Sequence, residues 1–97
     1  MQVRHADKKL ERLETEQDSS AGFDAKVVRA YRKLMQVIRA AVDERAFYAL
    51  KSLHYEKLKG DRKDERSMRL NKQYRLVLKL EENNGKTVVI VSIEDYL

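Results

Sequence analysis

The spacing of apolar residues changes near residue 54, and this change limits the folds open to the chain. From residue 24 to 42, apolar residues recur at steps of three and four, the period of a helix that buries one side. From Tyr55 onward apolar and polar residues tend to alternate, and Thr87–Ile93 is almost continuously apolar and β-branched, as in strands. The sequence therefore predicts an α+β fold, with N-terminal helices packed on one face of a mainly antiparallel, curved β-sheet.

The first half predicts a short strand at Met1–Arg4 and then two helices. Asp7 is expected to cap the first helix, with Leu10 and Leu13 on its buried face. Asp24 is expected to cap the second helix. The apolar stripe of this second helix consists of Val27, Ala30, Tyr31, Leu34, Val37, Ile38, Ala41 and Val42.

A short third helix and a series of strands are predicted next. Asp43 is expected to cap this helix, and its inward residues are Ala46, Phe47, Leu50 and Leu53. Strands are predicted at Tyr55–Leu58, Arg66–Asn71, Tyr74–Glu82 and Thr87–Ile93, with turns at Gly60–Asp64, Asn71–Gln73 and Asn83–Gly85. The alternation predicts that Met68, Leu70, Leu76, Leu78 and Leu80 are buried, while the intervening basic residues lie on the opposite face.

The positive charge of the chain is concentrated in its second half. Residues 54–80 hold nine Lys or Arg and four Asp or Glu, so their net charge equals the +5 of the whole chain. A folded surface with this charge favours a polyanion such as nucleic acid. The simpler alternative is that the charges only keep the surface hydrated, as is expected for most basic residues of the second helix.

Composition excludes several classes of site. The chain has no cysteine, so disulfides and thiolate metal sites are impossible, and its two histidines are too few for a convincing metal site. It contains no GxGxxG, P-loop or HExxH motif. No apolar run approaches the roughly 18 residues needed to cross a bilayer, and MQVRHADKK lacks the pattern of a signal peptide. We therefore expect a cytoplasmic protein with no cofactor and no membrane partner.

Two motifs in the basic segment resemble a known family. They are LKGDR at Leu58–Arg62 and S-x-R-L-N-x-Q-Y-R-L at Ser67–Leu76. With the β-rich segment that follows and the EDYL at residues 94–97, they resemble the HigB (host inhibition of growth) toxins of the RelE/ParE superfamily. The helical first half is compatible with this family in pattern and length. The resemblance implies one domain over residues 1–97 with the RelE-like fold of microbial ribonuclease toxins.

The resemblance implies an mRNA interferase, an endoribonuclease that enters the ribosomal A site and cuts the exposed codon without a metal. The 2′-hydroxyl of the RNA attacks the adjacent phosphate and leaves a 2′,3′-cyclic phosphate and a free 5′-hydroxyl. This reaction needs a group that takes the 2′ proton, cations that stabilise the phosphorane and an acid for the leaving oxygen. By their places in the family motifs, Lys59 and Arg75 match the cations, and Asp95 and Tyr96 match part of the C-terminal catalytic group.

The chain departs from the family at two positions that concern proton transfer. Leu97 stands where the family usually has a histidine, and a leucine cannot carry a proton. Glu56 stands where the family often has another histidine, while His54 lies two residues earlier and on a strand would face the same way. Both are therefore candidate proton carriers, and a histidine ordinarily titrates closer to neutral pH than a carboxylate. The alternative for His54 is an ordinary surface histidine.

The remaining cations are expected to grip message and ribosomal RNA rather than the scissile phosphate. They are Lys57, Arg62, Lys63, Arg66, Arg69 and Lys72. Arg75 is the best single candidate because a guanidinium can hold two phosphate oxygens at once, although a surface cross-strand ion pair is the simpler alternative. Tyr96 is expected either to stack on an unpaired base or to pack on the core.

The implied partners are a HigA-like helix-turn-helix antitoxin, the ribosome and mRNA, with operator DNA bound only through the antitoxin complex. Two other functions stay open at this point. One is a ParE-like toxin that poisons DNA gyrase without being an enzyme, which the missing terminal histidine favours and the two motifs disfavour. The other is a plain RNA-binding domain, or a toxin that has lost its activity.

Overall fold

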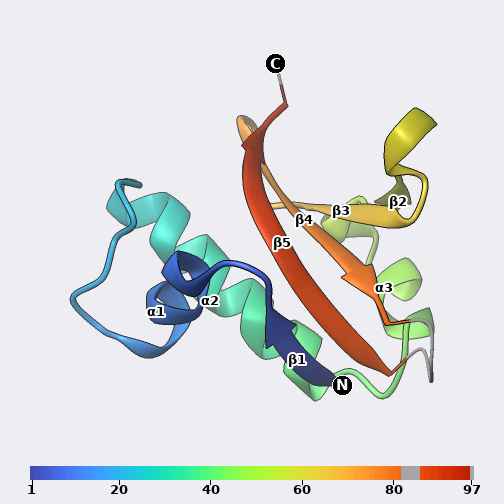
Figure 1. The fold of residues 1–97 in the computed structure, drawn as a ribbon, viewed down its shortest axis with the longest axis horizontal. Helices are drawn as coiled ribbons and strands as arrows, with labels where there is room; N and C mark the ends of the chain where they lie inside the picture. The colour runs from blue at the N-terminus through green and yellow to red at the C-terminus, as the bar shows by residue number, and fades with distance from the viewer. Residues whose placement is uncertain (82–85, 97) are drawn as a thin grey trace.

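The computed structural model describes residues 1–81 and 86–96. These residues form a five-stranded sheet with helices packed against it (Figure 1). The elements in chain order are β1 (Gln2–His5), α1 (Lys8–Thr15), α2 (Ala25–Ala40), α3 (Arg45–Ala49), the 3-10 helix η1 (Lys51–Leu53), β2 (Glu56–Lys57), the 3-10 helix η2 (Gly60–Arg62), β3 (Glu65–Arg69), β4 (Tyr74–Leu80) and β5 (Thr87–Asp95). The predicted α+β class is confirmed.

The sheet has the strand order β1-β5-β4-β3-β2. The edge strand β1 runs parallel to β5, and the other neighbouring strands are antiparallel, as predicted. The register between β4 and β5 shifts at Val77/Leu78. Such a bulge bends a sheet and strengthens its twist, and β4 and β5 are visibly curved in Figure 1.

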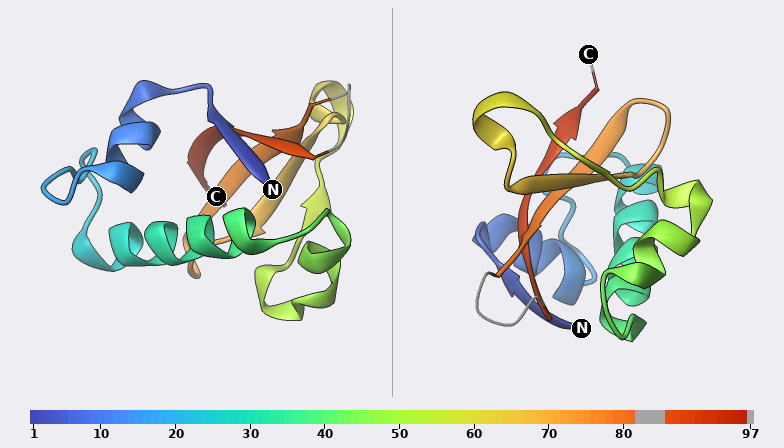
Figure 2. Two further views of the ribbon diagram at one scale, coloured as in Figure 1. Left: turned by 90° about the horizontal axis from the view of Figure 1, so that it is seen from below. Right: turned by 90° about the vertical axis from the view of Figure 1, so that its right-hand side faces the viewer.

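The helices pack on one face of the sheet and close the core there. Seen from below, α2 runs along beneath the strands (Figure 2). The fully buried side chains of this core include Leu13, Tyr31, Met35, Ile38 and Phe47 from the helices and Met68, Leu76, Leu78, Val88 and Ile90 from the strands. Leu70 and Leu80, which were also predicted to be buried, are partly buried against the core. Burial of each large apolar side chain contributes roughly 2 kcal/mol to folding.

Two helix caps predicted from the sequence are present. Asp7 Oδ1 accepts the backbone N–H of Lys9 at 2.8 Å, and Asp24 Oδ1 accepts that of Val27 at 3.0 Å. Each carboxylate satisfies an N–H group that the helix leaves without a partner, which is typically worth about 1 kcal/mol. The caps fix the starts of α1 and α2.

The predicted end of α2 is wrong by two residues. The helix stops at Ala40 because the backbone of Ala41 is extended, with φ −68° and ψ 142°. Val42 therefore lies beyond the helix, where helical spacing no longer predicts its direction, and it is 80% exposed instead of buried.

The helix and the strand that follow α2 are both shorter than predicted. Glu44 occupies the N-cap position of α3, although the Asp43 carboxylate still accepts the N–H of Arg45 at 3.0 Å. Leu50 lies between α3 and η1 and is 45% exposed, so its predicted burial is wrong. The strand predicted over Tyr55–Leu58 is reduced to the two residues of β2.

The later strands differ from the predictions mainly at their ends. β3 begins one residue earlier and ends two residues earlier than predicted, and β5 continues to Asp95. Val88, Val89 and Ile90 of β5 are buried, whereas residues 91–93 are only partly buried, so the predicted burial holds for the first half of the strand. Glu82, predicted to end β4, and the turn predicted at Asn83–Gly85 lie outside the described residues.

Candidate active site

The face of the sheet opposite the helices carries a row of charged side chains. Arg69 on β3 lies opposite Arg75 on β4, which lies opposite Glu94 on β5. Side chains at directly opposed positions project to the same face of a sheet. The adjacent pair Met68 and Leu76 faces the core, so the row of Arg69, Arg75 and Glu94 faces away from the helices.

Arg66 lies on the other face, and the expectation that it belongs to the cationic face is wrong. It is opposite Leu78, which is in the core, and its Nε lies 3.5 Å from Glu44 Oε2. The same carboxylate oxygen accepts the Tyr55 hydroxyl at 2.6 Å. Burial, helped by this hydrogen bond, raises the pKa of Tyr55. Arg66 therefore links β3 to the segment that contains α3.

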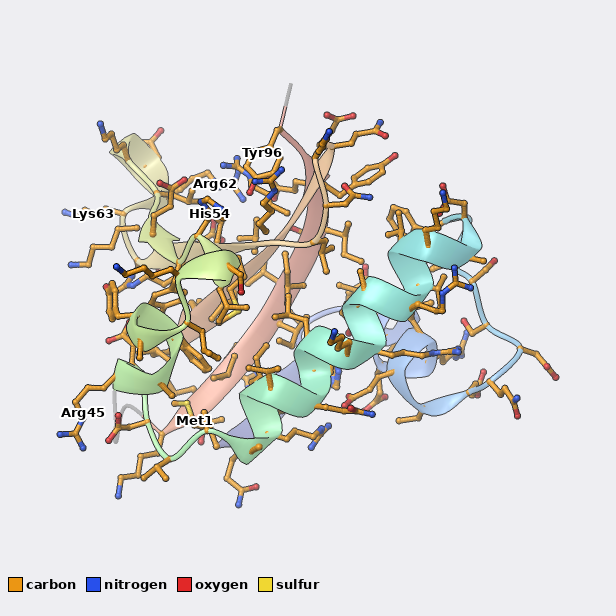
Figure 3. All side chains as sticks on the ribbon, turned by 180° about the vertical axis from the view of Figure 1, so that it is seen from behind. Met1, Arg45, His54, Arg62, Lys63 and Tyr96 are labelled. Atoms are coloured by element: carbon orange, nitrogen blue, oxygen red, sulfur yellow. The ribbon has the colours of Figure 1, made fainter. Side chains whose placement is uncertain are left out.

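A cavity of about 270 Å³ lies beside the charged row. His54, Glu56, Arg69, Lys72 and Tyr96 line it. These residues come from the end of η1, from β2 and β3, from the turn between β3 and β4, and from the end of β5, so the fold assembles a site from distant parts of the chain. His54 and Tyr96 lie near each other at one end of the molecule (Figure 3).

Tyr96 connects this cavity to Arg75. The Cζ atom of Arg75 lies 5.7 Å from the centre of the Tyr96 ring, within the range of a cation–π contact. The Tyr96 N–H donates to the Gln73 carbonyl at 2.8 Å, and the Gln73 amide donates to Asp95 Oδ2 at 3.1 Å. Burial raises the pKa of Tyr96, so its hydroxyl keeps its proton at neutral pH. With 38% exposure, the ring can still contact a ligand.

His54 is held in an unusual backbone conformation at the cavity. Its φ of 48° and ψ of 47° place it in the left-handed region, which is uncommon for residues other than glycine. Its Nε2 lies 3.4 Å from Arg69 Nη1. Strained residues persist where the surrounding structure holds them, and they are enriched at functional sites.

Arg62 reaches across this face and binds two carboxylates. Its Nε donates to Glu65 Oε1 at 2.6 Å, and its two Nη atoms donate to the oxygens of Glu94 at 2.8 and 2.5 Å. Ser92 Oγ donates to Glu94 at 2.6 Å. The hydrogen bond from Arg62 is the main cause that lowers the pKa of Glu94 to about 2, and the two carboxylates raise the pKa of Arg62.

Three lysines near the η2 turn do not line the cavity: Lys57 and Lys63, predicted to contact RNA, and Lys59, predicted as a catalytic cation. Lys57 lies opposite Arg66 in register and therefore points to the helix side of the edge strand. Lys59 and Lys63 flank η2 and are exposed. Lys59, matched to a catalytic cation by its motif, thus lies outside the assembled cavity.

All five residues that line the cavity were predicted from the sequence as site residues, but the role of Glu94 was not. His54, Glu56, Tyr96, Arg69 and Lys72 were all predicted site residues, the last two only as RNA contacts. Glu94 stands next to the expected Asp95–Tyr96 pair, and strand alternation places it on the face of Ser92. Strand alternation could therefore have indicated which face Glu94 lies on. The sequence does not show that Glu94 lies opposite Arg75, because this depends on the register between β4 and β5.

The part of the chain that the structure describes, residues 1–81 and 86–96, contains neither a cluster of metal ligands nor a membrane-spanning helix. In these ranges no three His, Asp or Glu side chains are placed together to hold a metal ion. None of the helices in this part of the chain is long and apolar enough to cross a membrane.

The sequence matches the model of a known protein family over most of its length. A family described as "RelE-like toxin of type II toxin-antitoxin system HigB" matches residues 3–93. The chain belongs to the HigB-like toxin family. No match is found among curated protein sequences.

Several solved structures have a fold similar to that of this HigB-like toxin. A YoeB/ParE toxin from Agrobacterium tumefaciens is 18% identical, with 100% of both chains covered and a TM-score of 0.61. YafQ from E. coli strain BL21(DE3) is 12% identical, with 97% of this chain and 91% of that chain covered and a TM-score of 0.61. The YoeB-YefM complex from Staphylococcus aureus gives 19% identity, coverage of 100% and 98%, and a TM-score of 0.59. At these identities the likeness concerns the fold.

Proposed function

We propose that this HigB-like toxin is a ribosome-dependent endoribonuclease that cuts mRNA and thereby stops translation and growth. The observation that carries the proposal is the cavity in which His54, Glu56 and Tyr96 gather beside Arg69 and Lys72. It combines groups that accept or hold protons with cations, which is what cleavage by a 2′-hydroxyl requires. An acid–base group next to phosphate-binding cations is not needed by a domain that only binds RNA.

The geometry suggests a role for each group. Arg75 and Arg69 lie side by side in register and would bind the scissile phosphate and stabilise the negative charge of the phosphorane. Glu56 or His54 would take the proton from the 2′-hydroxyl. Tyr96 would donate a hydrogen bond toward the leaving 5′-oxygen or stack on the neighbouring base.

Exposed cations outside the cavity would hold the message and the ribosome. Lys59 and Lys63 flank η2 at the edge of the same face and would contact phosphates of the ribosomal RNA. A toxin that acts on the ribosome would work in the cytoplasm. The reaction would use the 2′-hydroxyl of the RNA as nucleophile and would need no bound cofactor.

Primer extension on a message translated in vitro tests the proposal. With the parent protein we expect new 5′ ends within codons, only when ribosomes are present. Arg75→Ala should reduce cleavage about 100-fold or more, as expected for loss of a group that stabilises a charged transition state. Lys26→Ala, an exposed cation on α2, is the matched control and should cut like the parent. Equal cleavage by parent and Arg75→Ala would refute the assignment.

The proposed partner is an antitoxin, of the HigA-like helix-turn-helix kind, that inhibits the toxin and carries the complex to operator DNA. Membership of a type II toxin family supports an antitoxin, and one solved structure with this fold is a YoeB-YefM complex. Co-expression with the product of an adjacent gene should restore growth. Operator binding should require that product and should not occur with the toxin alone.

A second candidate function is poisoning of DNA gyrase without catalysis. The leucine at position 97 favours it, since the toxins that cleave RNA usually have a histidine there. In this case the message would stay intact in translation reactions, and gyrase reactions would accumulate cleaved DNA. The acid–base groups around the cavity favour the nuclease.

A further inference from the structure

Glu94 contacts two arginines on the sheet face opposite the helices, here called the open face, and it binds them unequally. Both of its oxygens accept hydrogen bonds from Arg62, at 2.8 and 2.5 Å, and Ser92 supplies a third at 2.6 Å. Arg75 Nη2, by contrast, lies 3.7 Å from Glu94 Oε1, which is beyond hydrogen-bonding distance. The carboxylate is therefore hydrogen-bonded by Arg62, whereas Arg75 forms only a longer ion pair with it.

Without Arg62, the register of the sheet would make Arg75 the hydrogen-bonding partner of Glu94. The two residues are directly opposed on β4 and β5, the arrangement in which oppositely charged side chains pair across strands. A carboxylate hydrogen-bonded to Arg75 would occupy the N–H groups that a phosphate needs, which the longer ion pair leaves available. The availability of Arg75 thus depends on what holds Glu94 away.

We infer that Arg62 is a positioning residue that keeps Glu94 bound to itself and so leaves Arg75 free to bind the phosphate. The inference rests on the proposed function, in which Arg75 contacts the scissile phosphate. It also changes the role expected for Arg62, which the sequence suggested was a contact to RNA. Arg62 acts through Glu94 and Arg75 and does not itself touch the substrate.

The contacts of Arg62 suit this role. Its Nε is bound to Glu65 at 2.6 Å, so the guanidinium is fixed between β3 and β5 by two carboxylates. A guanidinium has planar, paired N–H groups that match a carboxylate, whereas a lysine offers one point of contact. Figure 3 shows Arg62 at the same end of the molecule as His54 and Tyr96. A carboxylate is ionised at neutral pH, so the negative charge of Glu94 persists and must be held in place; the hydrogen bonds from Arg62 that hold it also lower its pKa to about 2.

A double-mutant cycle at positions 62 and 94 tests the inference. Arg62→Ala should reduce single-turnover cleavage of ribosome-bound message about tenfold or more, because the released Glu94 would then pair with Arg75. Glu94→Gln should cleave at least as well as the parent, since it removes the competing charge. The double variant Arg62→Ala/Glu94→Gln should recover most of the lost activity.

The results distinguish a positioning role of Arg62 from direct contact with RNA and from a purely structural role. If the double variant is as poor as Arg62→Ala, Arg62 acts by touching RNA or by holding the η2 segment, and the inference is overturned. If Glu94→Gln alone is as poor as Arg62→Ala, Glu94 itself orients Arg75, and the inference is again overturned. Should Arg62→Ala fail to fold, Arg62→Gln with and without Glu94→Gln gives the same comparison.

A second readout does not depend on RNA cleavage. Inorganic phosphate is titrated into the parent and the three variants while the side-chain ¹⁵N signals of Arg75 are followed by NMR. We expect weaker phosphate binding at Arg75 in Arg62→Ala and recovery in the double variant. If the parent cuts no message, the proposed function fails, but this titration still decides the role of Arg62. Equal phosphate affinity in the parent and Arg62→Ala would reject the inference.

Discussion

Arg32 on α2 should be among the most important polar side chains for stability, because it satisfies the end of another helix. Its Nε donates to the Leu13 carbonyl at 2.9 Å, and its Nη2 donates to the carbonyls of Glu16, Gln17 and Ser19 at 2.8, 3.1 and 3.3 Å. Leu13 belongs to the last turn of α1, where carbonyl groups have no helical partner. One side chain therefore fastens α1 and the following loop to α2.

Replacing Arg32 by methionine removes these donors while it keeps most of the apolar stem. The carbonyls of Glu16 and Gln17 belong to exposed residues and can turn to water, so their loss should cost little. Leu13 is buried, and an unsatisfied carbonyl there costs about 1–3 kcal/mol. We expect the free energy of unfolding to fall by about 2 kcal/mol, which lowers the Tm of a domain of this size by about 10 °C.

Urea unfolding followed by circular dichroism measures this change. The midpoint should fall with little change in the slope, since the surface exposed on unfolding stays nearly the same. Arg29→Met, which changes an exposed arginine of the same helix, is the matched control and should stay within about 0.5 kcal/mol of the parent. If Arg32→Met lies within that range as well, water replaces the guanidinium and the reasoning is refuted.

Four further predictions concern the open face and the core. Tyr96→Ala should weaken binding of a non-cleavable RNA about tenfold while Tyr96→Phe keeps most of the affinity, because stacking needs only the ring; equal loss in both would argue for the hydroxyl. The pKa of Glu94 is lowered from 4.5 to about 2 in the folded protein, so ionised Glu94 stabilises the fold fully above pH 4.5, and this contribution is lost as the pH falls toward 2. Over that pH range the urea midpoint of Glu94→Gln should therefore fall less than that of the parent. Arg66→Met should lower the unfolding free energy, in the same urea assay, by about 1 kcal/mol yet leave cleavage per folded molecule unchanged, and a loss of cleavage would restore Arg66 to the site. Lys63→Ala should reduce the slope of log affinity against log salt for RNA by about 0.7, and an unchanged slope would exclude a phosphate contact.

The helical half of the fold could be predicted because local signals determine it. Asp7 and Asp24 are caps whose effect acts within one turn of the helix, and the apolar stripe of α2 shows directly which side is buried. Val42 and Leu50 were misplaced because helical spacing was extended past the residue where the helix stops. The end of a helix depends on where the chain must go next, which a local pattern does not contain.

The candidate site could be predicted residue by residue but not as an arrangement. Motif positions identified Arg75 and Tyr96, but their contact depends on how β4 and β5 align. Arg66 was expected among the RNA contacts because of its charge, although it lies two residues before Met68 and strand alternation therefore puts both side chains on the core face. The pair of Arg62 and Glu94 joins residues 32 positions apart, and charge composition alone cannot choose among many possible partners.

The pairing of β1 with β5 joins residues 2–5 to residues 87–90. During synthesis the chain emerges one residue at a time, so the first strand waits without its neighbour until nearly all of the domain has been made. The row of Arg69 and Arg75 likewise lacks Glu94, and the cavity lacks Tyr96, over the same interval. A cell that makes this HigB-like toxin therefore produces nearly all of the domain before the charged row and the cavity can form.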